Sequence, residues 1–474
     1  MSAAKGMTGK GLDDLNVGDS ATSVRTLTAN DLVFYSHASG DLNPLHLPEL
    51  DGDGDGAPEA LAPPAWLAGL ISALIGSHLP GPGSRELSWR SEVGAPVRLG
   101  EAVTASVEVS DKSEAHVTLS ARVEGPAGPA LTAVVEVAPA DRPQRFDDVA
   151  LPDLLVRRHP HFERLLAACD GIEPAVTAIV CPHTDEALLG ALLAADRDLI
   201  TPILVGETAK IDAAAAEAGR ALSGLQIVDA PDPKSAAAMA CQLVANGEAA
   251  SVMKGHLHTD TLLRAVLDRS HGLRGDRRLS HVFVMDVPGE DHLMFVTDAA
   301  VNIAPDLIAK ADIVQNAIDL ARALGVSLPR AGVLSAVETV NPALPSTLDA
   351  AALSKMAERG QITGGLVDGP LAMDNAVDLE AARVKGLTGA VAGRAEILIT
   401  PNLEAGNMLA KELTFVARAE AAGVVLGARA PVIVTSRADS EFSRLVSCAV
   451  AALHAEWIRT GRPAPGVADS APAT

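Results

Sequence analysis

From about residue 177 onward the chain alternates short apolar runs with Ala-rich amphipathic stretches, and this alternation restricts the fold more than any other feature. The first run, TAIVCPH, leads into DEALLGALLAADRD, and later runs include ASVMKG, HVFVMDVP, EILITPN and PVIVTS. Such runs indicate strands buried on both faces, and the stretches between them have helical periodicity. The pattern predicts a mainly parallel sheet with helices on both faces and ligands at the carboxyl ends of its strands.

The chain has a different character before about residue 140. An apolar stretch over residues 64–79 is followed by three alternating runs, AVTASVEVSD, AHVTLSARVEG and ALTAVVEVAP. Alternation of apolar and polar residues indicates strands with one buried face, joined as antiparallel hairpins. A hydrophobic helix followed by such hairpins predicts a curled sheet wrapped on that helix, which is the α+β arrangement called a hot-dog fold.

The predicted organisation is therefore a hot-dog domain over residues 1–140 and an α/β domain over residues 159–460. Residues 141–158 mix Pro with charge and have no sustained periodicity, as a linker between domains does. Residues 461–474 are rich in Pro, Ala and Gly, and we expect them to be disordered.

Charge and cysteine content exclude several classes of function. Lys plus Arg number 38 against 60 Asp plus Glu, a formal net charge of −22, so we expect no nucleic-acid or anionic-membrane surface. An anionic substrate then needs a local basic pocket. The four cysteines form no CxxC pair, the N-terminus has no signal-peptide run, and the longest apolar run is too short to span a bilayer. We expect a cytoplasmic protein.

The segment TSRADS at residues 435–440 follows the apolar run PVIV. A strand that ends in a hydroxyl, a guanidinium and a carboxylate can hold a phosphate oxygen and a reacting carbonyl, while the acid takes a proton. Ser436, Arg437 and Asp439 are thus candidate catalytic residues. Taken alone, the same string also fits an ordinary polar turn or helix cap.

Four upstream blocks accompany this segment. They read MKGHLHTDTLLRAVL from Met253, TDAAVNIAP from Thr297, TLDAAALSKMAERGQITGGLVDGPLAMDNAV from Thr347 and TPNLEAGNMLAKELTF from Thr400. With GARAPVIVTSRADS they closely resemble the phosphate acetyltransferase/phosphate butyryltransferase family, over about residues 155–457 and in the family's order and spacing. The resemblance implies a two-lobed α/β domain like that of isocitrate and isopropylmalate dehydrogenases. It also implies reversible transfer of a short acyl group between coenzyme A (CoA) and inorganic phosphate.

Polar residues and glycines in these blocks are candidate substrate contacts. Lysine at a strand end offers a positive charge to phosphate, and glycine turns let the backbone approach an acyl or phosphate group. The candidates are Lys254, Thr297, Asp298, Asn302, Gly365, Asp368, Glu404, Asn407 and Lys411. Each also fits a structural role, as a surface lysine, a tight turn or a helix cap.

Two departures from the acetyl branch of the family favour a butyryltransferase-like substrate range. Thr414-Phe415 stands after Lys411 where that branch carries Gln-Arg. That branch also tends to carry an acid seven residues after the serine, where this chain has Ser443. Asp439 is the nearest carboxylate to the serine, and it is therefore our candidate general base.

The predicted mechanism is direct transfer in a ternary complex, with CoA as a substrate and no tightly bound cofactor or metal. To attack an acyl phosphate, the CoA thiol, with a reference pKa of about 8.5, must lose its proton, here to Asp439. Arg437 would neutralise phosphate charge. Ser436 would hydrogen-bond the oxyanion or the phosphate, because no triad or nucleophile elbow surrounds it.

The segment YSHASGDLNPLHL from Tyr35 resembles the motif of MaoC-like (R)-specific enoyl-CoA hydratases, in which an Asp and a His five residues later activate water. Asp41 and His46 hold these positions, although they also fit a turn cap and a structural histidine. Pro63-Pro64 stands where that family has His-Gly, and proline has no N–H for the thioester oxygen. We expect a weak hydratase or a CoA-thioester-binding scaffold, with an active hydratase as the alternative.

Two further expectations concern rivals and partners. The strand pattern also fits decarboxylating dehydrogenases, but no G-x-G-x-x-G follows a strand and no dense Asp cluster for Mg²⁺ is visible. Hot-dog domains complete a binding tunnel with a partner, and transferases of this family pair through their second lobe. The resemblances therefore imply a homo-oligomer of at least two chains.

Overall fold

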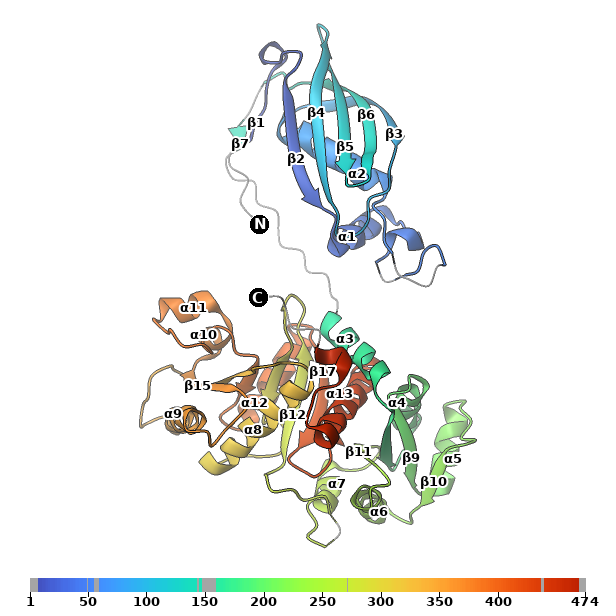
Figure 1. Cartoon of the computed structure of the whole chain (residues 1–474), viewed down its shortest axis with the longest axis vertical. Helices are drawn as coiled ribbons and strands as arrows, with labels where there is room; N and C mark the ends of the chain where they lie inside the picture. The colour runs from blue at the N-terminus through green and yellow to red at the C-terminus, as the bar shows by residue number, and fades with distance from the viewer. Residues whose placement is uncertain are drawn as a thin grey trace. The chain divides into compact units, whose positions relative to one another are not determined.

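The computed structural model describes residues 7–48, 50–54, 59–142, 145–146, 159–270, 272–435 and 439–468. The chain forms two compact units, Met1–Val156 (unit 1) and Arg157–Thr474 (unit 2), which are described separately (Figure 1). No helix in the described ranges is long and apolar enough to cross a bilayer. The division between the units falls within the predicted linker, while the finer domain bounds stay a prediction.

Unit 1 is an antiparallel five-stranded sheet curled around one helix (Figure 1). Across the sheet the order is β2 (Ser20–Thr26), β4 (Ala102–Lys112), β5 (Val117–Gly125), β6 (Gly128–Ala138) and β3 (Arg85–Val93). Alternate residues of β4, β5 and β6 are buried against α2 (Pro64–Ser77), whose Leu67, Ile71, Leu74 and Ile75 face the sheet. This is the hot-dog arrangement that the alternating runs predict.

Smaller elements complete unit 1. They are β1 (Met7–Thr8), paired with β7 (Arg145–Phe146), the 3-10 turns η1 (Leu12–Asp14) and η2 (Pro44–His46), and helix α1 (Ala29–Ser39). Helix α1 begins at a capping box, in which the Thr28 side chain accepts from the Asp31 N–H and the Asp31 carboxylate accepts from the Thr28 N–H. Two N–H groups at the start of the helix are thereby satisfied.

Unit 2 is built on one eleven-stranded sheet, in the order β10-β9-β8-β11-β18-β17-β12-β13-β16-β14-β15. The strands are β8 (Ala175–Val180), β9 (Ile200–Gly206), β10 (Gln226–Asp229), β11 (Ser251–Lys254), β12 (Ser280–Asp286), β13 (Met294–Thr297), β14 (Arg330–Leu334), β15 (Leu366–Leu371), β16 (Ile397–Ile399), β17 (Glu420–Leu426) and β18 (Val432–Ile433). The helices are α3 (Pro160–Ala168), α4 (Asp185–Asp196), α5 (Thr208–Glu217), α6 (Pro233–Ala245), α7 (Thr259–Val266), α8 (Leu307–Ala323), α9 (Pro345–Glu358), α10 (Met373–Val377), α11 (Leu379–Val384), α12 (Leu403–Phe415), α13 (Glu441–Thr460) and α14 (Pro465–Ala468), with the 3-10 turn η3 (Cys169–Gly171) after α3.

The sheet is mainly parallel, as predicted, but its centre is antiparallel. Strands β10, β9, β8, β11 and β18 run parallel, and so do β13, β16, β14 and β15. Between these two groups, β18 pairs with β17, β17 with β12 and β12 with β13, all antiparallel. Three reversals in succession leave the carboxyl ends of the two parallel groups at opposite ends of the strands.

The predicted likeness to isocitrate dehydrogenases stays a prediction.

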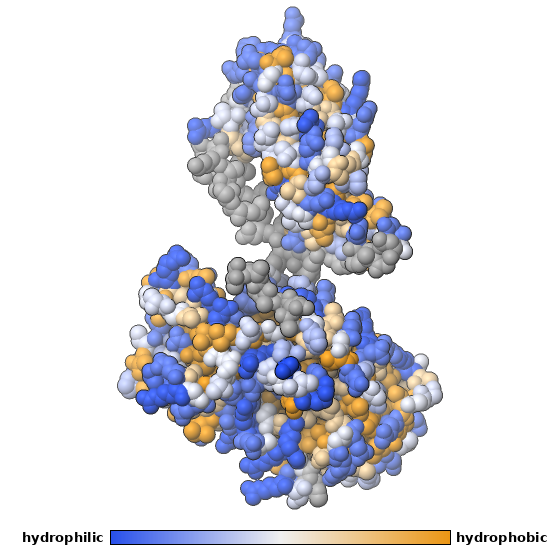
Figure 2. Space-filling model, in the orientation of Figure 1, coloured by the Kyte–Doolittle hydropathy of each residue, from blue (hydrophilic) through white to orange (hydrophobic). Residues whose placement is uncertain are grey.

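Helix α13 lies at the centre of the unit 2 core. Its buried residues run from Ser443 to His454 and pack with α3, α4, α8 and β17. On the visible faces of both units, Figure 2 shows hydrophobic residues interrupted by hydrophilic ones. Scattered apolar side chains of this kind are normal on a folded surface.

The expectation of a disordered tail over residues 461–474 is wrong as far as Ala468. Residues 465–468 form α14, and Ala464 and Val467 are only 1% and 2% exposed. Val467 packs on Gly325, which has no side chain to block it, while Gly466 lies against Ala168 of α3. The Pro, Ala and Gly content concealed two apolar residues at helical spacing. Residues 469–474 lie outside the described ranges.

We expect Asp286→Asn to change how the stability of unit 2 depends on pH. Asp286 is 1% exposed, its Oδ2 accepts the Phe162 N–H at 2.9 Å, and burial raises its pKa above the ordinary 3.8. A raised pKa means that stability present near pH 3.8 is lost as the pH rises through the folded-state value. Asparagine can still accept from Phe162 but carries no charge. Thermal unfolding between about pH 4 and pH 8 should therefore show wild type losing stability relative to the variant.

The exposed Asp291→Asn is the matched control and should follow wild type across this range. An Asp286→Asn variant whose stability tracks wild type at every pH would contradict a buried, charged carboxylate at this position.

Candidate active site

The candidate site of unit 2 lies where β11 and β18 end side by side. Val252 pairs with Val432 and Met253 with Ile433, so Lys254 and Thr435 leave the sheet next to each other. Both residues line a hollow of about 190 Å³, which we call the phosphate hollow. Its remaining polar lining comes from the start of α4, from the connection after β11 and from α13: Thr184, Glu186, His256 and Arg444.

The phosphate hollow is our candidate for the local basic pocket that the sequence leads one to expect. Arg444 is 9% exposed and its Nη1 donates to the Glu186 backbone oxygen at 2.9 Å, which fixes the guanidinium beside the start of α4. Lys254 adds a second cation. The N-terminus of α4, capped by Thr184, contributes the positive end of a helix dipole. Two cations, one of them held by a backbone oxygen, and a helix start can bind a phosphate group.

A second hollow, which we call the carboxylate hollow, is lined by Asp439 and Ser440 at the end of the TSRADS segment. It has a volume of about 280 Å³. Asp439 lines it, together with residues of β12, α12, β17 and α13: Phe283, Asn407, Lys411, Thr414, Phe415, Arg418, Glu420, Ser440 and Ser443. The two described ends of TSRADS, Thr435 and Asp439, thus open onto different hollows. Ser436 and Arg437, between them, lie outside the described residues.

The carboxylate hollow contains an acid that sequence reasoning missed. Glu420 begins β17, and its Oε2 accepts the Ser443 hydroxyl at 2.7 Å and the Ser440 hydroxyl at 3.1 Å. No motif surrounds Glu420, because EAAGVVL reads as an ordinary strand. The available signal was Ser443 itself, which stands where the family resemblance leads one to expect an acid.

The α12 candidates divide between the hollow and the surface. Asn407 and Lys411 line the carboxylate hollow, with the Lys411 ammonium 6.0 Å from the centre of the Phe415 ring. The Asn407 amide donates to the Ala299 backbone oxygen at 3.2 Å. Glu404 is exposed and lines neither hollow. At the start of α12 the Asn402 side chain accepts the Ala405 N–H at 2.9 Å, so a side chain already caps the helix there.

The structure does not bring Thr297, Asp298 and Asn302 to either hollow. Thr297 ends β13 and the other two residues follow it, and the carboxyl end of β13 lies at the opposite end of the sheet because of the antiparallel centre. Asp298 is 2% exposed and accepts the N–H groups of the turn that follows, including that of Asn302 at 3.0 Å. The Thr297 hydroxyl donates to the His281 backbone oxygen at 2.9 Å. These contacts shape a turn, and Asn302 lines a third hollow of about 400 Å³.

Gly365 and Asp368 also lie away from the two hollows. A side chain on Gly365 would meet the Pro329 backbone oxygen at 2.8 Å, so glycine is required there for close packing. Asp368 lies in β15, and its Oδ1 accepts the Gly369 N–H at 2.8 Å. Both positions belong to the β14–β15 side of the sheet.

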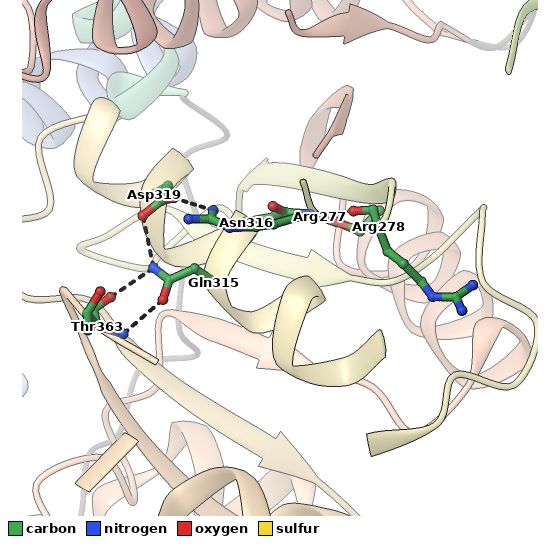
Figure 3. A network of polar contacts seen from close by, with 7 residues as sticks. Arg277, Arg278, Gln315, Asn316, Asp319 and Thr363 are labelled. Atoms are coloured by element: carbon green, nitrogen blue, oxygen red, sulfur yellow. Dashed lines mark hydrogen bonds and ion pairs between the residues drawn. The ribbon is translucent and has the colours of Figure 1, made fainter. Parts of the chain in front are cut away.

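Another hollow of unit 2, of about 440 Å³, contains none of the predicted site residues. Figure 3 shows the polar network beside it, in which Asp319 accepts from Arg277 Nη1 at 2.6 Å and from Gln315 Nε2 at 3.0 Å. Gln315 also bonds the backbone of Thr363 as donor and acceptor, at 2.9 and 2.8 Å. These bonds join α8 to two neighbouring connections, which is a structural role.

In unit 1, Asp41 and His46 form the pair that the sequence predicts. His46 Nδ1 lies 2.7 Å from Asp41 Oδ2, and Asp41 Oδ1 accepts the Asn43 N–H at 3.0 Å. The Asn43 N–H, followed by His46, lowers the pKa of Asp41. Asp41 therefore caps the turn and orients the imidazole at the same time.

The start of α2 lies beside this pair, since the Leu61 N–H donates to the Leu45 backbone oxygen at 2.8 Å. Pro63 caps the helix and Pro64 is its first residue. The N–H groups of Trp66 and Leu67 both donate to the Pro63 oxygen, at 2.9 and 3.3 Å. In this described stretch, the Ala65 N–H is the helix-start donor without a backbone acceptor.

Metal and thiol chemistry find no support in the described ranges. There, no three His, Cys, Asp or Glu side chains are grouped to hold a metal ion. All four cysteines are free and buried, and burial raises the pKa of Cys181 to about 11 and of Cys169, Cys241 and Cys448 to about 12. Such thiols are poor nucleophiles.

Comparisons with known proteins concern the family to which unit 2 is similar. The profile of the family described as phosphate acetyl/butaryl transferase matches residues 232–452. The phosphate acetyltransferase of Rhizobium meliloti is 57% identical over 303 residues, which cover 64% of this chain and 96% of that protein. The phosphate butyryltransferase of Clostridium beijerinckii is 43% identical over 294 residues, which cover 62% of this chain and 97% of that protein.

A solved structure, a branched-chain phosphotransacylase from Enterococcus faecalis V583, is 31% identical with a TM-score of 0.52, and the match covers 59% of this chain and 99% of that one. Because the 57% identical relative is named an acetyltransferase, overall identity does not place this chain nearer the butyryl branch. The chain belongs to the phosphate acetyl/butyryl transferase family, whose members are acyltransferases.

Proposed function

We propose that unit 2 transfers a short acyl group reversibly between CoA and inorganic phosphate. The observation that carries this proposal is that Thr435 lines a basic hollow and that Asp439, four residues later, lines a carboxylate-bearing one. The reaction needs both, because phosphate brings negative charge and the CoA thiol must lose a proton. No tightly bound cofactor belongs to the proposal, and CoA is a substrate.

Within this proposal Lys254 and Arg444 bind the phosphate, and Arg437 and Ser436 contact the phosphate and the carbonyl oxygen. Lys254 and Arg444 line the same hollow as Thr435, one residue before Ser436. Charge-assisted hydrogen bonds from several donors stabilise the charge that develops on the acyl phosphate oxygens. The sequence assigns the thiol proton to Asp439, which lines the adjoining hollow.

The acyl group occupies the carboxylate hollow in our proposal. Phe283, Thr414 and Phe415 line it beside the polar groups, and Phe415 is the residue where the resemblance leads one to expect a cation. An apolar wall of this kind accommodates methylene groups, each worth about 0.8 kcal/mol when buried. We therefore propose a substrate range that extends from acetyl to butyryl groups.

For unit 1 we propose CoA-thioester binding with little or no hydration activity. The Asp41–His46 pair can activate water, as the hydratase resemblance implies. The two prolines at the start of α2 remove two N–H groups from the corner where the thioester oxygen would bind.

We also propose that two or more chains assemble and that the protein is cytoplasmic.

The proposed function predicts that residues 157–474 alone transfer acyl groups, because every proposed transferase residue lies within unit 2. The measurement is thiol release from acetyl-CoA or butyryl-CoA with phosphate, and thiol consumption with the acyl phosphate and CoA. A folded 157–474 fragment that transfers no acyl group, beside an active full chain, would place unit 1 in the active site.

A fragment that ends at residue 460 lacks α14 and should be less stable by about 2 kcal/mol, the value of burying one valine.

Arg437→Lys should lower turnover by about 10- to 100-fold and raise the KM for phosphate. An ammonium cannot reproduce the planar pair of donors of a guanidinium, and a hydrogen bond to a charged group is worth about 1.5 to 3 kcal/mol. The matched control is Arg459→Lys, whose side chain is 73% exposed at the end of α13. Wild-type kinetics for Arg437→Lys would remove Arg437 from the site.

Unit 1 should hydrate crotonyl-CoA poorly, because loss of one oxyanion donor costs about 10² to 10³ in rate. Pro64→Gly adds an N–H at the start of α2 and should raise the rate, whereas Asp41→Asn should abolish what activity there is. Loss of enoyl absorbance measures the reaction. Efficient hydration by wild type that depends on Asp41 would show that the Ala65 N–H already serves the thioester oxygen.

A further inference from the structure

We infer that Glu420, and not Asp439, is the general base of the acyl-transfer reaction. This inference rests on the proposed function, since it concerns the same site. Glu420 is the first residue of β17, at the centre of the eleven-stranded sheet, and its side chain lines the carboxylate hollow. It is half-buried, so it can meet both the protein and a substrate.

Two serine hydroxyls hold the Glu420 carboxylate in place. Ser443 Oγ donates to Oε2 at 2.7 Å and Ser440 Oγ donates to the same oxygen at 3.1 Å. The Ser440 hydroxyl also caps α13, where it accepts the Ser443 N–H at 2.9 Å. A hydroxyl has one proton to donate. Because the Ser440 oxygen acts as an acceptor at the helix start, its proton remains available for the bond to Glu420. The carboxylate is therefore oriented by the same residues that begin the helix.

Glu420 and Asp439 differ in the backbone element that holds each carboxylate. Asp439 lies on the connection between β18 and α13, whereas Glu420 begins a central strand that pairs on both sides. Groups on strands hold a productive geometry better than groups on connections. Both acids line a hollow that also contains Lys411 and Arg418.

One further acid faces Glu420 from the neighbouring strand. Asp286 of β12 lies directly opposite Glu420 in the antiparallel ladder, which places both side chains on the same face. The Phe162 N–H that Asp286 accepts offsets part of the negative charge that the two acids bring to this face.

The proton balance of the reaction fits this assignment. When acyl-CoA is made, Glu420 takes the thiol proton as sulfur bonds to the carbonyl carbon of the acyl phosphate. The bond from that carbon to the phosphate oxygen then breaks, and its electron pair leaves with the phosphate. In the opposite direction phosphate attacks the thioester, and protonated Glu420 returns the proton to the departing sulfur.

The test is Glu420→Gln in the full chain, assayed with butyryl phosphate and CoA from about pH 7 to 9.5. At about pH 7 we expect kcat to fall by roughly 10² to 10⁴ with little change in the KM for CoA. The loss should shrink toward about pH 9.5, because the thiol, with a reference pKa of about 8.5, then ionises without a base. Ser443→Ala, which removes one hydrogen bond from the carboxylate, should lose about 10-fold with the same pH dependence.

The matched control is Glu412→Gln, an exposed glutamate of α12 outside both hollows, which should retain wild-type turnover at every pH. A Glu420→Gln loss of equal size at about pH 7 and 9.5 would indicate a structural role and overturn the inference. Wild-type turnover for Glu420→Gln, with the pH-dependent loss in Asp439→Asn, would return the base to Asp439. A wild-type chain that transfers no acyl group would overturn the proposed function itself.

Discussion

The antiparallel ladder between β12 and β17 determines where the chemical groups of unit 2 lie. Seven residue pairs, from Ser280 with Leu426 to Asp286 with Glu420, hold the two strands together. The ladder lies between two parallel groups of strands, and these two groups run in opposite directions. As a result, Lys254 and Thr435 meet at one end of the strands while Thr297 leaves the sheet at the opposite end. The same ladder ends in Glu420, so it also supplies the inferred base.

Much of the fold could be predicted from the sequence, because alternation and continuous apolar runs report how many faces of a strand are buried. Alternating residues in β4, β5 and β6 gave the curled sheet of unit 1, and the apolar runs after residue 177 gave the large sheet of unit 2. Strand direction was not accessible in this way. HVFVMD and EAAGVVL are buried on both faces like their parallel neighbours. A pattern of burial is the same for a parallel and an antiparallel strand, so it does not indicate strand direction.

The sequence could indicate which side chains share a hollow where each follows its own strand, and it could not where another residue brings a side chain in. Lys254 and Thr435 follow adjacent strands and do line one hollow. Asp298 lies in a block that resembles the family, but its carboxylate accepts hydrogen bonds from three backbone N–H groups of its own turn. Glu420 shows the reverse case. It has no motif, and only the contacts with Ser440 and Ser443 reveal it as part of the site.

The first turn of α13 connects the two hollows mechanically. Ser440 and Ser443 face Glu420, while Arg444, the next residue, faces the phosphate hollow and bonds the Glu186 oxygen. Twelve buried side chains of α13, from Ser443 to His454, fix this helix in the core. The cation that we propose binds phosphate and the hydroxyls that orient the inferred base therefore belong to one helix. A substitution that displaces the start of α13 should disturb phosphate binding and proton transfer together, whereas Glu420→Gln should disturb proton transfer alone.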